Sequence, residues 1–200
     1  GTAVQKQIPI KVLKGAYAGT TYLGDNPANP IIAVAQGISH SLALAADGSV
    51  YAFGRNFNGQ LGDGTFINRN TPIRVVKGAY VGTTFIGDNA SNPIIGISCG
   101  AAHNMVIAAD GSVFAFGYNF YGQLGDGTTI DRSSPIRILK GLYNGASFLG
   151  DNPANPIIKL AGGIHHSLAL AANGQVYSVG NNTYGQLGDN TTINRSTPVN

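Results

Sequence analysis

Three histidines are the side chains most able to carry acid–base or metal chemistry. His40, His103 and His166 follow one another at a constant spacing of 63 residues. Imidazole is a common general base and metal ligand, but a catalytic site needs one asymmetric cluster of unlike groups, and a threefold repeat supplies every group three times. We therefore predict a structural role for these histidines and expect no enzymatic activity. His165 has no histidine counterpart in the other copies, and we expect it at the surface rather than as a base.

The other reactive side chains do not form a recognisable site either. Cys99 is the single cysteine, and its counterparts are Gln36 and Gly162, so we expect a small buried side chain and no disulfide. Asp63 and Thr65 supply oxygen ligands in every copy, but calcium needs about six to eight converging oxygens, and turn capping explains the same residues. We predict no catalytic residue, no metal and no cofactor.

Composition narrows the class of partner. Charged residues make up only 10% of the chain, and the net charge of +3 is spread along it, as Arg69, Arg132 and Arg195 illustrate by recurring at the period. Nucleic-acid binding would need clustered basic residues, and spanning a membrane would need an apolar run of about 20 residues. We therefore expect neither partner. The low charge suits a secreted bacterial protein, and the sequence otherwise leaves the localisation unknown.

The 63-residue unit reads as strands joined by turns. In the second copy, the apolar runs 103–109 and 112–117 flank Asp110-Gly111, a strong hairpin signal that favours a type I′ turn. A buried strand over 93–98 precedes this hairpin, and an alternating outer strand over 135–139 follows it. The stretch 140–156 fits either a long loop or an extra edge hairpin.

Four strands per repeat and no helix predict an all-β fold. Repeats of this length with four strands are typical of the blades of a β-propeller, whereas a β-solenoid, the alternative, usually has much shorter repeats. We predict a single array over residues 1–200. Its three four-stranded blades are assigned to units 10–72, 73–135 and 136–198.

One long motif carries a family resemblance. It runs Gly-x-x-His-Ser-Leu-Ala-Leu-x-x-Asp-Gly-x-Val-Tyr-x-Phe-Gly-x-Asn-x-x-Gly-Gln-Leu-Gly-Asp-Gly over residues 37–64 and recurs over 100–127 and 163–190. This pattern resembles the regulator of chromosome condensation repeat family. The resemblance implies a propeller with one blade per repeat, most often seven blades, built as a binding platform. Apolar side chains, Phe53, Phe116 and Val179, stand where that family usually has Trp.

The resemblance gives two different functional leads. The eukaryotic founder of the family exchanges nucleotide on a small GTPase through a single wedge that projects from one blade. In this chain the insertion-like segment 14–30 is present in every repeat, so we do not expect exchange activity. Similar bacterial propellers include a secreted inhibitor of β-lactamases that binds through loops on one face, which is the closer analogy.

Three blades are fewer than the roughly four to eight that close a propeller. The outer strand of the third unit is short, and residues 8–14 match the corresponding segment 134–140 of the second unit. We therefore expect this N-terminal strand to complete the third blade of a neighbouring chain, head to tail. A homodimer would then have six blades, which we favour, and a homotrimer nine; a cut piece of a longer natural or designed array is the alternative. The expected inter-chain residues are Ile8, Pro9, Ile10, Val12 and Leu13.

The copies differ most in one loop, which we expect to bind a partner. The frame between Gly54 and Gly59 is kept in every copy while three of the four positions inside it change, and exposed aromatic and Arg side chains suit a protein-binding face. Neutral drift at exposed sites, a purely structural or designed self-assembling module, and glycan or peptide binding between blades are the alternatives. The predicted partner-binding residues are Arg55, Phe57, Asn58, Tyr118, Phe120, Tyr121, Asn181, Thr183 and Tyr184.

Overall fold

Three four-stranded antiparallel sheets make up the fold. The computed structural model describes residues 8–200, and these contain strands and no helix. We call the sheets blades 1, 2 and 3. Blade 1 consists of β1 (Ile31–Gln36), β2 (His40–Ala45), β3 (Val50–Gly54) and β4 (Arg69–Arg74). Blade 2 consists of β5 (Ile94–Cys99), β6 (His103–Ala108), β7 (Val113–Gly117) and β8 (Arg132–Arg137). Blade 3 consists of β9 (Ile157–Gly162), β10 (His166–Ala171), β11 (Val176–Gly180) and β12 (Arg195–Val199).

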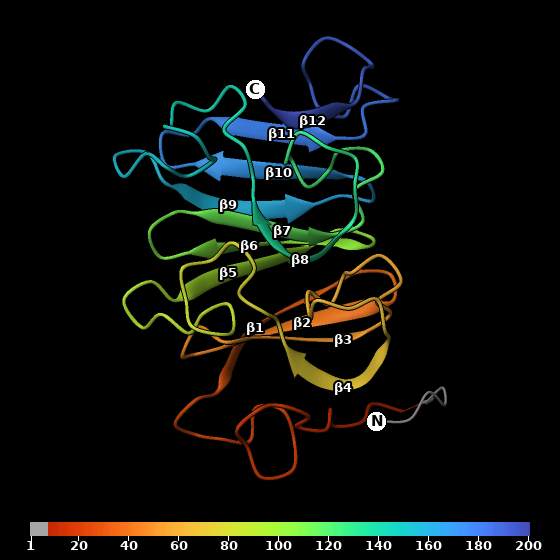
Figure 1. The fold of residues 1–200 in the computed structure, drawn as a ribbon, viewed down its shortest axis with the longest axis vertical. Helices are drawn as coiled ribbons and strands as arrows, with labels where there is room; N and C mark the ends of the chain where they lie inside the picture. Colours follow the sequence, from red (N-terminus) through yellow and green to blue (C-terminus); the bar gives the residue numbers. More distant parts are fainter. Residues whose placement is uncertain (1–7) are drawn as a thin grey trace.

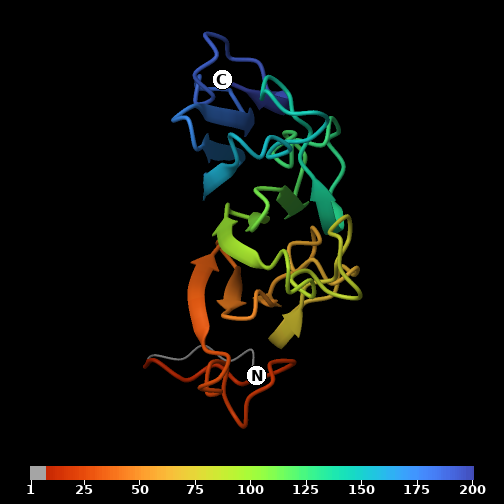
Figure 2. The same cartoon turned by 90° about the vertical axis from the view of Figure 1, so that its left-hand side faces the viewer.

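Each blade is a simple meander in which consecutive strands pair. The blades follow one another along the longest axis of the molecule, with the two chain ends at opposite ends of the array (Figure 1). A quarter turn shows that the first strands, β1, β5 and β9, lie along the same side (Figure 2). This is the arrangement of three consecutive propeller blades, so the predicted fold class is confirmed. Ring closure is not part of this single chain.

The predicted central hairpins are present, but their turns are of another type. In β2–β3, Leu44 pairs with Val50 across Asp47-Gly48, and Gly48 has a φ of 87°. A type I′ turn needs positive φ at both central residues. Among residues 8–200 only one non-glycine residue, Asn190, has a positive φ, so Asp47 does not. The turn is therefore wider, with glycine alone in the left-handed region, as in hairpins that end in a bulge.

The outer strands begin earlier than the sequence indicates. β8 covers Arg132–Arg137 instead of 135–139, and a register shift between Ala115 and Gly117 moves its pairing with β7. Pro135 is tolerated inside this strand because the strand lies at the sheet edge, where no hydrogen-bond donor is required. The segment 140–156 is a loop, with a single bridge between Leu139 and Phe148.

The N-terminal segment and the end of blade 3 are the two parts that the predicted exchange of a strand between chains would join. β12 pairs with β11 and gives blade 3 its own fourth strand. Within the described residues 8–14, Leu13 forms a bridge with Tyr22 in the following loop, while Ile8 and Ile10 are exposed. Residues 197–199 of β12 are the repeat counterparts of 8–10, and the expected entry of segment 8–14 into a neighbouring blade stays a prediction.

The core lies between the blades rather than within them. Leu42 and Val50 of blade 1 are buried in one cluster with Ile94 and Phe114 of blade 2. The loop that precedes blade 2 closes this cluster, because Tyr80 meets the Phe114 ring edge-on at 5.6 Å between centroids. A second cluster of the same kind joins blades 2 and 3. Each blade is thus stabilised chiefly by burial of apolar area against its neighbours.

The two end faces expose residues whose counterparts are buried inside the array. Val50 and Val113 are fully buried against the following blade, whereas the equivalent Val176 of blade 3 is 50% exposed. At the other end Val34 is 78% exposed, whereas its equivalent Ile97 packs against the core. Both ends of the array therefore present blade-packing surfaces to solvent.

The loop before each blade docks on the outer strand of that same blade. The amides of Ala16, Ala79 and Leu142 donate to the carbonyls of Pro72, Pro135 and Pro198 at 2.8, 2.8 and 3.0 Å. These contacts group each loop with the strands that follow it. The unit boundaries at 10–72, 73–135 and 136–198 stay a prediction.

Candidate functional site

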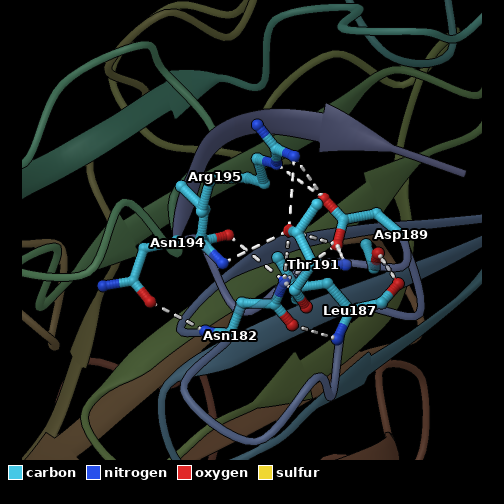
Figure 3. Close-up of polar contacts among 8 residues, drawn as sticks. Asn182, Leu187, Asp189, Thr191, Asn194 and Arg195 are labelled. Carbon is cyan, nitrogen blue, oxygen red and sulfur yellow. Dashed lines mark hydrogen bonds and ion pairs between the residues drawn. The ribbon is translucent and has the colours of Figure 1, made fainter.

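The loop after the third strand of each blade is built around a buried asparagine. In blade 3 this residue is Asn182, whose Oδ1 accepts from the Leu187 amide at 2.9 Å and whose Nδ2 donates to Asp189 at 2.9 Å and to the Thr191 carbonyl at 3.0 Å (Figure 3). Asn194 Oδ1 in turn accepts from the Asn182 amide at 2.8 Å. Asn56 and Asn119 make the equivalent contacts in blades 1 and 2. A rigid polar frame therefore recurs three times.

An ion pair fastens the same frame to the outer strand. Arg195 lies 2.6 Å from Asp189 (Figure 3). In blade 2, Arg132 lies 2.6 Å from Asp126. The Thr191 hydroxyl lowers the pKa of Asp189 most, and Arg195 and Asn182 add to this effect against the opposing effect of burial, so the pKa falls to about 2. The carboxylate thus stays ionised at neutral pH and keeps its ion pair with Arg195.

The predicted binding residues are carried by this frame. Phe57 is 61%, Phe120 64% and Tyr184 92% exposed. Arg55 and Thr183 are also exposed, while Asn181 is buried at 8% exposure. The Asn181 side chain faces inward. Its Nδ2 donates to the Thr183 hydroxyl, and its Oδ1 accepts from the side-chain nitrogen of Gln186. The three loops lie at the same end of their strands, and we call their positions 55–58, 118–121 and 181–184 the loop face.

Blade 2 places an aromatic cluster at the middle of the loop face. The Tyr118 and Phe120 rings are nearly parallel at 6.4 Å, and Tyr121 meets Phe120 edge-on at 5.1 Å. His165 of blade 3 joins them, with its ring 4.9 Å from Tyr121 and 5.7 Å from Tyr118. Burial raises the pKa of Tyr118 most, and electrostatic interactions with Tyr121 and Asp131 raise it further, so this phenol stays protonated at neutral pH.

A pocket of about 200 Å³ opens beside this cluster, between all three blades. Ser39, Ala102 and His165 occupy the same position of the three repeats, and all three line it. The small side chains of Ser39 and Ala102 leave space for the pocket, and the imidazole of His165 forms one of its walls. His165 Nδ1 is buried and has no hydrogen-bond partner among the described residues.

The first loop supplies the pocket's positive charge. Arg55 lines the pocket and lies over the Phe57 ring at 5.1 Å, and it forms no ion pair with any residue in 8–200. Asn58 lines the same pocket and donates to Asp131 at 2.9 Å. The other oxygen of Asp131 accepts from the Asn119 amide at 2.8 Å, so both oxygens of this carboxylate are occupied.

The structure thus brings together some predicted binding residues and separates others. Arg55, Asn58 and Tyr118 meet at the pocket, and ring contacts extend this group to Phe57, Phe120 and Tyr121. The third loop, with Asn181, Thr183 and Tyr184, contributes no residue to the pocket. His165 was predicted at the surface and is instead half-buried in the pocket wall. Its lack of a counterpart in the other repeats is the signal that singles it out.

The repeated histidines connect neighbouring blades. His40 Nε2 lies 2.8 Å from Asn104 Oδ1, and His103 Nε2 lies 3.0 Å from Ser167 Oγ. The contacts of His40 and His103 fit the predicted structural role, and each partner is a side chain of the next blade. Burial above all lowers the pKa of His103 to about 3, with smaller effects from the neighbouring histidines. A ring that stays neutral at physiological pH donates one hydrogen bond between blades and is screened from solvent.

Three further roles can be tested on the described residues: a reactive thiol, a metal site and a membrane-spanning helix. Burial raises the pKa of Cys99 to about 12, so its thiol is not ionised at neutral pH. Within residues 8–200, no three His, Cys or Asp side chains come together as a metal site would require. These residues also include no helix of a length and hydrophobicity that would cross a bilayer.

Comparison with known proteins extends the sequence resemblance. Two family models, both described as "Regulator of chromosome condensation (RCC1) repeat", match the chain. The first covers residues 47–107, 110–170 and 173–200, and the second covers 31–60, 94–123 and 157–186. Each model therefore recurs once per blade, with the period that the sequence shows.

Curated relatives are much longer than this chain. Human Protein RCC2 is 36% identical over 153 residues, which is 76% of this chain and 25% of that protein. The human probable E3 ubiquitin-protein ligase HERC4 is 34% identical over 168 residues, or 84% of this chain and 14% of the ligase. Further relatives come from frog, zebrafish and rat. These animal relatives give no support to a bacterial source.

Solved structures agree with the fold. Human WBSCR16 superimposes with a TM-score of 0.70 at 25% identity, over 90% of this chain and 42% of that one. Prp20p from Saccharomyces cerevisiae gives a TM-score of 0.64 at 24% identity, over 85% of this chain and 37% of that one. With the family models repeated on all three blades, these matches show that the chain belongs to the regulator of chromosome condensation (RCC1) repeat family.

Proposed function

We propose that this chain is a non-catalytic protein-interaction scaffold that binds its partner through the loop face. One observation carries the proposal: an identical frame around Asn56, Asn119 and Asn182 holds loops whose exposed positions differ. Exposed aromatic side chains on a rigid support lose little conformational entropy on binding, and Tyr and Arg are enriched among residues that dominate interface energies.

The binding described for a similar protein fits this class of function. The structure of Prp20p is described with its binding to Gsp1p and histones, which concerns that protein and supports protein binding as a use of the fold. The HERC4 match covers 14% of a ligase, so the enzyme's activity is not transferred to these repeats. We therefore assign no reaction to the chain.

Capture of partners with matched variants tests the loop face. Phe120→Ser removes an exposed ring from the face, and Leu142→Ser removes an exposed side chain of similar apolar character, 63% exposed, from a loop outside it. We expect proteins retained by the parent and by Leu142→Ser to be lost with Phe120→Ser. Equal retention by all three proteins would contradict the proposal. No specific protein retained, with glycans retained on an array instead, would favour the glycan alternative.

We further propose that the chain self-associates head to tail through its end faces. The Val176 face of blade 3 repeats the surface that blades 1 and 2 present to their followers, and the Val34 face of blade 1 repeats the surface that receives them. Two different end surfaces that fit each other head to tail generate closed rings where the rotation permits. Two chains would give six blades, and three would give nine. The predicted entry of residues 8–14 into blade 3 of a neighbouring chain would be part of this contact.

A further inference from the structure

We propose that the pocket between the three blades recognises a carboxylate side chain, Asp or Glu, of the protein that binds the loop face. This inference rests on the proposed protein-binding function and names the chemistry of one contact. Ser39, Ala102 and His165 line the pocket, Arg55 lies at it with no ion pair in residues 8–200, and Tyr118 adds an aromatic wall.

The size of the pocket selects a side chain rather than a small molecule. Its volume of about 200 Å³ is below the roughly 300–1,000 Å³ of sites that enclose drug-sized ligands and cofactors. It lies within the loop face, so a side chain projecting from a docked protein would enter it. A pocket of this kind fixes the orientation of a partner with a few placed polar groups.

The charge of the pocket selects a single negative group. Arg55 presents a planar guanidinium that pairs with a carboxylate through two parallel hydrogen bonds. Asp131 is the nearby carboxylate, and donors from Asn58 and Asn119 already occupy both of its oxygens. Phosphate recognition usually employs a cluster of arginines, and Arg55 is the one arginine that lines this pocket. One unpaired cation matches one carboxylate.

Neutral groups around Arg55 suit the rest of such a side chain. The Tyr118 phenol, kept protonated by burial above all, can donate a hydrogen bond, and His165 contributes a buried ring nitrogen without a partner. Ile38 and Tyr118 line the pocket and offer apolar surface to the methylene groups. In the first two repeats, Ser39 and Ala102 take the position that His165 has in the third. Their small side chains leave the pocket open, whereas further imidazoles would fill it.

Peptide titration followed by NMR tests this assignment. The probes are an acetylated, amidated Gly-Ser-Glu-Phe-Ser-Gly peptide and its matched versions with Gln or phosphoserine in place of Glu. We expect saturable shifts of the Arg55, Tyr118 and His165 signals with the Glu peptide, at least about tenfold weaker binding of the Gln peptide, and weakening by salt. Arg55→Gln should abolish the shifts, whereas Lys140→Gln, which removes the same charge elsewhere, should not.

Three results would overturn the proposal. These are equal binding of the Glu and Gln peptides, tighter binding of the phosphoserine peptide, and no shift at the pocket up to about 10 mM peptide, where a millimolar site would be mostly occupied. Partner capture separates this proposal from the proposed function. If Phe120→Ser loses the partner and Arg55→Gln keeps it, the loop face binds protein and the carboxylate assignment is wrong. If neither variant loses it, the protein-binding function itself fails.

Discussion

At the scale of single residues, buried asparagines hold each loop together and buried histidines contact the next blade. Asn119 is fully buried and bonds through both its oxygen and its nitrogen. His103 is fully buried and reaches Ser167 of the next blade. Buried polar groups of this kind contribute little when paired but are costly when a partner is removed. Substitutions at these positions therefore test the polar frame directly.

Removing the Asn119 side chain should destabilise the protein strongly. Asn119→Ala leaves the Leu124 amide and the loop carbonyls without partners, so we expect the free energy of unfolding to fall by about 2–4 kcal/mol. Asn144→Ala, at an exposed position, should change it by less than about 0.5 kcal/mol. Urea denaturation of the parent and the two variants measures both values. Equal effects of the two substitutions would show that the frame does not stabilise the loop.

Stability should fall as the pH drops from 7 to 5, because of the buried histidines. The pKa of His103 is about 3 in the folded chain and about 6.5 when unfolded, so between these values the unfolded state binds the extra proton and is favoured. The cost is up to about 1.4 kcal/mol per pH unit below 6.5 for each such group. Protonation of the aspartates with lowered pKa values reduces the stability of the fold only near pH 4 and below, outside this window.

His103→Gln isolates this effect, because an amide can keep the hydrogen bond to Ser167 without titrating. We expect the unfolding free energy of the variant to decrease less between pH 7 and pH 5 than that of the parent, by up to about 2 kcal/mol. Urea denaturation at the two pH values gives the comparison. The same decrease in both proteins would mean that His103 is not kept neutral by the fold.

At the scale of elements, the loop before each blade is fastened to that blade's outer strand. Gly78 has a φ of 52°, and a Cβ there would lie 2.0 Å from the Pro135 carbonyl oxygen. Gly64 also has a positive φ, 79°, but a Cβ would meet no atom within 4 Å. A substitution at Gly64 therefore tests backbone strain alone, whereas one at Gly78 also disturbs the docking contact.

Alanine at these two glycines should give unequal losses of stability. Gly64→Ala should cost about 1 kcal/mol, since it adds only left-handed strain. Gly78→Ala should cost several times more, because the loop must also leave the outer strand. Thermal or urea unfolding measures the difference, and proteolysis within residues 78–92 should become faster for Gly78→Ala alone. Equal costs would contradict the docking role.

The sequence predicts the elements better than their edges and meeting points. The Asp-Gly and Asn-Gly pairs place the hairpins, and the period of 63 gives three blades. The start of β8 escapes prediction because the register shift between Ala115 and Gly117 is a matter of pairing, which no single-strand pattern contains. The pocket escapes it for a related reason: Ser39, Ala102 and His165 lie 63 residues apart in sequence and converge only when blades pack.

At the scale of the whole molecule, the end faces decide whether one chain is a sufficient unit. Val176 is half exposed where its counterparts are fully buried. Val176→Asp puts a charge on this surface. Val81→Asp puts a charge on a loop instead, at a residue that is 78% exposed. If the faces join chains head to tail, Val176→Asp should yield monomers and Val81→Asp should not. Sedimentation of the two variants checks this, and unchanged association of Val176→Asp would exclude this face as the contact.

The mass of the unsubstituted chain in solution is the most direct test of the proposal that chains join head to tail through their end faces. Light scattering after gel filtration gives the molar mass in solution, and the chain itself has a mass of 20.6 kDa. The account predicts a mass near two or three times this value, for six or nine blades. A stable, well-folded monomer at high concentration would contradict it, and would show that the exposed blade surfaces of this chain do not bind one another.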